Sequence, residues 1–126
     1  MTEEDADLRL EAARALRQAG HTVIIAFDGA QALAAIREHR PEAAVLAADM
    51  LIMSGVQVCR MMREDDDLRH IPVLLTRAPA GMHEMHIPDA GATAVLAGPV
   101  TSTQLVQCLN GLLQENRTVR LVYPAI

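Results

Sequence analysis

Three short apolar runs constrain the fold of this sequence more than any other feature. They are EAAVLAA over residues 42–48, IPVLL over 71–75 and ATAVLA over 92–97, and each is continuous rather than alternating. A strand that is apolar on both sides is buried on both sides, as in parallel sheets that carry helices on each face. A fourth run, HTVIIAF over 21–27, is rich in β-branched residues and also predicts a strand. We therefore expect a parallel sheet at the centre of the fold.

Amphipathic segments separate the predicted strands. Apolar side chains recur at helical spacing in four of them, over residues 5–19, 29–39, 56–63 and 102–116. Asp28 with Gln31, and Thr101 with Gln104, have the spacing of helix N-cap pairs. The alternation of helix and buried strand predicts a doubly wound α/β domain, with its parallel sheet covered on both faces.

The composition agrees with one domain and limits its partners. With 126 residues and 51% apolar content, the chain is long enough for one core and too short for two. The formal charge of −5 argues against nucleic acid or an anionic membrane as a direct partner. No apolar stretch is long enough to span a membrane and no leader precedes the first helix, so we expect a cytoplasmic protein. Cys59 and Cys108 lack the close spacing of a metal or redox pair, and we expect two reduced core thiols.

The order of these elements and several short motifs resemble the receiver domains of bacterial response regulators. The matching stretches are EDADLR (4–9), FDGAQAL (27–33), RPEAAVL (40–46), GVQVCRMMRED (55–65), IPVLLT (71–76) and DAGATAVLAGPV (89–100). The resemblance runs from about residue 3 to residue 114. It implies a receiver-like, flavodoxin-like fold and a role in two-component signalling and phosphorelay.

The same resemblance implies where a phosphorylation site would lie. An active receiver accepts a phosphoryl group on an aspartate at the end of its third strand, and two acidic residues hold a magnesium ion beside it. A hydroxyl and a lysine bind the phosphoryl oxygens, because positioning and cationic stabilisation supply the catalysis. In this sequence the corresponding positions are Ala47 for the acceptor, Gly98 for the lysine, Glu3 and Glu4 for the acidic pair and Val95 for the aromatic switch. The hydroxyl position is Thr76 when it is counted from the following motif and Arg77 when it is counted from Pro72.

Acceptor, lysine and switch residue are therefore absent, and all 11 basic side chains are arginines. The resemblance then implies a pseudo-receiver that has no catalytic activity and no cofactor, and that works through protein contacts independently of phosphorylation. The contact surface usual in the family corresponds to Met82, Met85, His86, Ile87, Val95, Thr103 and Gln107. We expect the partner to be a signalling protein or a second copy of the chain.

Asp49 and a pair of histidines offer alternatives to a pure interaction module. Asp49 lies two residues beyond Ala47, where it could serve as a substitute acceptor or form a cation site with the vestigial acidic pair. His83 and His86 share a face if their segment is helical and could hold a metal, although the sequence offers no third ligand. An atypical switch that binds a small ligand or cation is thus the alternative to an interaction module.

The sequence also lacks a strand that the family has. A receiver begins with a central strand before its acidic pair, yet only two residues precede Glu3. An empty central slot would leave backbone groups unpaired in the core, at a cost of about 1–3 kcal/mol for each. We expect the C-terminal run over 118–123, which has strand composition, to fill this slot through a right-handed crossover. The alternatives are exchange of this strand with a partner chain and a linker, so we divide the chain into a domain over 1–116 and a tail over 117–126.

Overall fold

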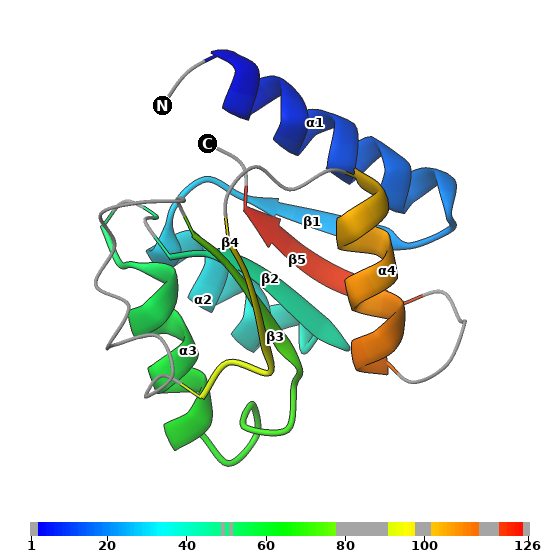
Figure 1. Ribbon diagram of the computed structural model, residues 1–126. Helices are drawn as coiled ribbons and strands as arrows, with labels where there is room; N and C mark the ends of the chain where they lie inside the picture. The colour runs from blue at the N-terminus through cyan, green and yellow to red at the C-terminus, as the bar shows by residue number, and fades with distance from the viewer. Residues whose placement is uncertain are drawn as a thin grey trace.

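The computed structural model describes residues 3–48, 50, 52–77, 91–97, 102–113 and 119–124. Its elements in chain order are α1 (Glu3–Gln18), β1 (Thr22–Ala26), α2 (Gly29–His39), β2 (Ala43–Ala47), α3 (Gly55–Glu64), β3 (Val73–Arg77), β4 (Ala94–Ala97), α4 (Ser102–Leu113) and β5 (Arg120–Pro124). The five strands form one twisted sheet between two layers of helices (Figure 1).

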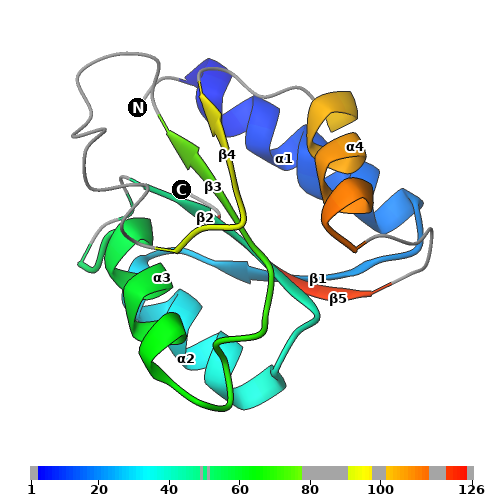
Figure 2. The same ribbon diagram turned by 60° about the horizontal axis from the view of Figure 1, so that its bottom comes forward.

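The sheet is parallel throughout and has the strand order β1-β5-β2-β3-β4. Helices α2 and α3 cover one of its faces, and α1 and α4 cover the other, as Figure 1 and Figure 2 show from two directions. The receiver-like, flavodoxin-like doubly wound fold expected from the sequence is confirmed.

The apolar core has two parts, one on each face of the sheet. The helices contribute Leu33, Ile36, Val58 and Met62 on one face, and Leu16, Leu105 and Leu109 on the other. In β2, Leu46 belongs to the first part and Val45 to the second, and both side chains are 0% exposed. Strand β2 is therefore apolar at every position because helices cover both of its faces.

Strand β5, the last element in the chain, lies near the middle of the sheet. It pairs with the whole of β1, from Thr22↔Arg120 to Ala26↔Pro124. On its other side it pairs with β2 at Ala43↔Leu121 and Ala44↔Val122. Of the three placements considered for this segment, the structure has the intramolecular one, in the slot that would otherwise be empty. The backbone groups of the two neighbouring strands thereby gain partners within the same chain.

Some element boundaries differ from the predicted ones for local reasons. Strand β3 begins at Val73 rather than at residue 71, since the Ile71 N–H donates to the Leu68 carbonyl in a turn, at 3.0 Å, and proline at 72 has no N–H. Helix α1 begins at Glu3 rather than at residue 5. The predicted end of the last helix at residue 116 and its cap at residue 101 lie outside the described residues.

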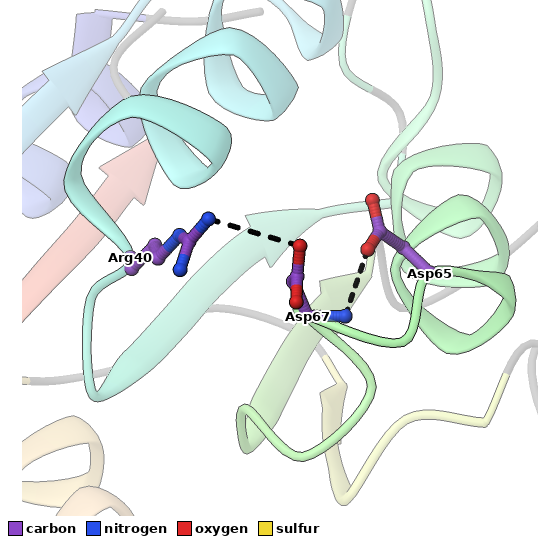
Figure 3. Close-up of polar contacts among 3 residues, drawn as sticks. All are labelled: Arg40, Asp65 and Asp67. Carbon is purple, nitrogen blue, oxygen red and sulfur yellow. Dashed lines mark hydrogen bonds and ion pairs between the residues drawn. The ribbon is translucent and has the colours of Figure 1, made fainter.

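The amino ends of the strands carry the exposed acidic loop after α3 (Figure 3). The Asp67 N–H donates to Oδ1 of Asp65 at 2.9 Å, and the Asp67 carboxylate forms an ion pair with Arg40 at 3.7 Å. Arg40 ends α2 in the left-handed conformation, with φ of 44°, and its N–H donates to the Ile36 carbonyl. An exposed ion pair contributes only about 0–1 kcal/mol. The loop is thus a solvated helix ending, at the edge of the sheet opposite the predicted site.

Candidate functional site

The predicted site lies at the carboxyl ends of the parallel strands, where doubly wound folds place their ligands. Strands β5, β2 and β3 end there at Pro124, Ala47 and Arg77. Helix α1 runs antiparallel to β1, to which a short turn joins it, so its first turn with Glu3 and Glu4 lies at this same edge (Figure 1). The fold therefore brings the backbone of the acidic pair to the edge where β2 ends.

Ala47 closes β2 as a buried residue. Its side chain is 1% exposed, and its carbonyl accepts a hydrogen bond from the Met50 N–H at 3.2 Å. The next residue, Ala48, donates its N–H to the Thr76 carbonyl at 2.8 Å, which continues the ladder between β2 and β3. The end of β2 is thus packed tightly, and the methyl group at its last position offers neither a nucleophile nor a ligand.

Two glycines allow the following loop to pack against its surroundings. A Cβ added to Gly55, at the start of α3, would collide with the carbonyl oxygen of Ala47. A Cβ added to Gly29, at the start of α2, would collide with the carbonyl oxygen of Met53. The loop between β2 and α3 is therefore held between the end of β2 and the first turn of α2, and only glycine fits at either contact.

A capping box starts α3 and was not among the predicted N-cap pairs. The Gln57 N–H donates to the Ser54 hydroxyl at 3.1 Å, and the Ser54 N–H donates to Oε1 of Gln57 at 3.0 Å. The S-x-x-Q spacing is visible in the sequence and would have predicted it. The predicted cap of α2 is confirmed, because the Gln31 N–H donates to Oδ1 of Asp28 at 2.7 Å.

Two large apolar side chains are exposed at the same edge. Ile52, in the loop after β2, is 82% exposed and has a φ of 69°. Phe27, directly after β1, is 59% exposed. The contact between Gly29 and Met53 brings their two loops together. A positive φ is unfavourable for a β-branched residue, and no sequence pattern predicts it at Ile52.

The structure describes only some of the remaining predicted site residues. Thr76 is half-buried and pairs with Ala47 across β2 and β3, so a hydroxyl residue does stand beside the end of β2. Val95 lies on β4 and is 39% exposed. The prediction that the run over 92–97 is buried on both sides is therefore wrong, because β4 is an edge strand. Thr103 and Gln107, on α4, are exposed. The other predicted residues, Asp49, Met82, His83, Met85, His86, Ile87 and Gly98, lie outside the described residues.

The two cysteines are free. Burial raises the pKa of the Cys59 thiol, an effect that Arg63 partly opposes, and burial also raises the pKa of the Cys108 thiol. Both are therefore protonated at neutral pH, as expected for inert thiols. Within the described part of the chain, no group of three or more His, Cys, Asp or Glu residues is arranged to hold a metal ion.

A family model for the response regulator receiver domain matches residues 1–110. The chain belongs to this family. Receiver domains act in two-component signalling and interact with signalling proteins. None of the described helices of this receiver is long and apolar enough to cross a membrane.

Individual relatives agree with this assignment. The receiver is similar to the polar-differentiation response regulator DivK of Brucella anthropi, at 31% identity over 117 residues that cover 91% of this chain and 95% of the relative. A crystal structure of a response regulator from Chloroflexus aurantiacus has a TM-score of 0.77 at 26% identity, covering 88% of this chain and 93% of that one. The receiver domain of NarL from Mycobacterium tuberculosis has a TM-score of 0.72 at 30% identity, covering 87% and 90%.

Proposed function

We propose that this chain is a degenerate receiver that acts as a protein-interaction module independently of phosphorylation. The observation that carries the proposal is Ala47. It is the last residue of β2, it is buried, and its register partner is Thr76 of β3. A carboxylate at this position would be the nucleophile of an active receiver, and a methyl group cannot replace it.

A second deficit supports the same conclusion. Phosphoryl transfer depends on cationic stabilisation of the transferred oxygens. The position expected for the lysine is Gly98, and the sequence contains no lysine at all. We therefore propose that the chain has no phosphotransfer activity and needs no cofactor.

The surface that remains is suited to protein contacts. Val95 on β4, with Thr103 and Gln107 on α4, is the described part of the predicted interaction face, and all three side chains are exposed. Phe27 and Ile52 add exposed apolar area at the carboxyl edge of the sheet. We propose a signalling protein or a second copy of the chain as partner, in the cytoplasm. The charge of −5 argues against nucleic acid or an anionic membrane. Because β5 pairs with β1 and β2 of its own chain, a homodimer formed by exchange of residues 118–123 would require this strand to leave the sheet.

The test is incubation of the full chain with a small phosphodonor and Mg²⁺, followed by intact-mass measurement. We expect no phosphoryl adduct on the wild-type chain. Ala47→Asp alone should stay largely unmodified because the cation is missing, and Ala47→Asp combined with Gly98→Lys should gain the adduct. A stable adduct on the wild-type chain would overturn the proposal.

Two experiments distinguish the proposed interaction module from the alternative functions. The first is the same mass measurement on a variant of Asp49, and the second is a cation titration. An adduct that is lost in Asp49→Asn would show that Asp49 is a substitute acceptor. Titration with Mg²⁺ or Mn²⁺ tests the vestigial acidic pocket of Glu3, Glu4 and Asp49, since hard cations prefer carboxylate oxygens. Saturable binding that disappears in Asp49→Asn would favour an atypical cation switch over an interaction module.

A further inference from the structure

One buried polar contact joins the end of the first helix–strand turn to the last strand. His21 is 7% exposed, and its Nδ1 accepts a hydrogen bond from the Val119 N–H at 3.1 Å. The Val119 carbonyl accepts a hydrogen bond from the Thr22 N–H at 3.0 Å. Both backbone polar groups of Val119 are thus bound at the point where β5 enters the sheet.

This contact lies beside the longer of the two strand pairings of β5, the one with β1. Strand β5 pairs with all of β1, but its register with β2 covers only Ala43 and Ala44. One further hydrogen bond, from the Glu42 N–H to the Arg120 carbonyl at 2.9 Å, joins β5 to the residue before β2. The imidazole therefore extends the more complete of the two ladders by one side-chain contact.

The hydrogen bond to Val119 defines which tautomer the neutral His21 imidazole adopts. A ring nitrogen that accepts a hydrogen bond carries no proton, so the neutral imidazole has its proton on Nε2. The backbone of His21 is also held in place, because its N–H donates to the Leu16 carbonyl at the end of α1, at 3.1 Å. Protonation of Nδ1 would set a donor against a donor and leave the buried Val119 N–H without an acceptor.

We propose that His21 is a proton-sensitive latch that holds β5 in the sheet. The neutral imidazole binds Val119 and keeps the strand in place. The imidazolium releases Val119 and frees the start of β5, so the occupancy of the central slot falls as the pH falls. Histidine is the side chain type best suited to such a device, since its unperturbed imidazole changes charge in the physiological range. The latch does not depend on the proposed function.

The backbone segments next to His21 carry charged residues in α1, in β5 and just before β2. Arg17 of α1 donates to the Val23 carbonyl at 3.2 Å, Arg120 belongs to β5, and Glu42 precedes β2. All three side chains are exposed, so solvent and salt screen their charges. The hydrogen bond from the Val119 N–H is an interaction that only the neutral imidazole of His21 can accept.

Amide hydrogen exchange of the full chain, followed by NMR and corrected for intrinsic rates, tests the latch. We expect the protection factors of Leu121 and Val122 to fall about tenfold between about pH 7.5 and about pH 5.5, the loss expected for one buried hydrogen bond. Wild-type protection factors in β5 that stay constant across this range would overturn the proposal without any variant.

Two variants sharpen the result. His21→Asn keeps an acceptor near the position of Nδ1 but does not titrate, so its β5 protection should be independent of pH. His70→Asn removes a histidine that is exposed on the surface and should keep the wild-type pH dependence. An unchanged pH dependence in His21→Asn, or its loss in His70→Asn, would show that another group is responsible and would refute the latch.

Discussion

Arg63→Ala tests how the two connections that flank β3 are held together. The Arg63 guanidinium donates to the carbonyls of Gly91 at 2.8 Å, Arg69 at 3.1 Å and Ile71 at 2.9 Å, and to Oγ1 of Thr93 at 3.4 Å. One side chain of α3 thus binds the loop before β3 and the segment before β4. Gly91 has a φ of 83°, and a Cβ there would lie 2.8 Å from Cγ of Arg63, so the aliphatic part of the side chain packs closely as well.

The expected cost follows from burial. The hydrogen bond to Ile71 is part-buried, and loss of its donor leaves a carbonyl poorly solvated, at about 1–3 kcal/mol. The other three hydrogen bonds are exposed, so water replaces much of their contribution and each is worth about 0.5 kcal/mol. We therefore expect Arg63→Ala to lower the free energy of unfolding by about 2.5–4.5 kcal/mol.

Urea denaturation followed by circular dichroism measures this loss. Arg60→Ala is the matched control, because Arg60 is exposed on the same helix and should change the free energy of unfolding by less than about 0.5 kcal/mol. Arg63→Lys should recover only part of the loss, since an ammonium cannot reach four acceptors in the planar arrangement of a guanidinium. A loss for Arg63→Ala no larger than that of Arg60→Ala would refute the reasoning.

Two further predictions follow from packing and burial. Gly55→Ala should lower the free energy of unfolding by more than about 2 kcal/mol, because its Cβ collides with the Ala47 carbonyl, whereas Gly111→Ala on α4 has open space and should raise it by about 0.5–1 kcal/mol. Denaturation curves of both variants check this, and similar effects would contradict it. A thiol reagent at neutral pH should label Cys108 slowly and Cys59 more slowly still, because burial raises both pKa values and Cys59 is fully buried. Mass spectrometry of the time course measures the order, and prior labelling of Cys59 would contradict it.

Much of the fold could be predicted because burial leaves a direct mark on the sequence. Strand β2 is covered on both faces, and its continuous apolar run shows this. The N-cap of α2 could be predicted from Asp28 and Gln31, since one local hydrogen bond defines it. The alanine at the end of β2 could be recognised from its place in the order of motifs.

Other features depend on contacts between residues far apart in the chain. The hydrogen bonds of Arg63 join three segments, and nothing in its neighbourhood distinguishes it from the exposed Arg60. The positive φ of Ile52 arises where the loop after β2 is held between Ala47 and the first turn of α2. No local pattern encodes such a constraint, because the atoms that impose it belong to other elements.

The sequence by itself determined the types of the elements, the parallel sheet between helices and the absence of lysine, since these depend on periodicity and composition. Only the tertiary structure decided where the last strand goes. The segment over 118–123 has the composition of a strand in any of its three placements, because composition shows that a strand is apolar but not which strands it pairs with. The register with β1 and β2, and the bond from Val119 to His21, place residues 119–124 in the sheet of their own chain.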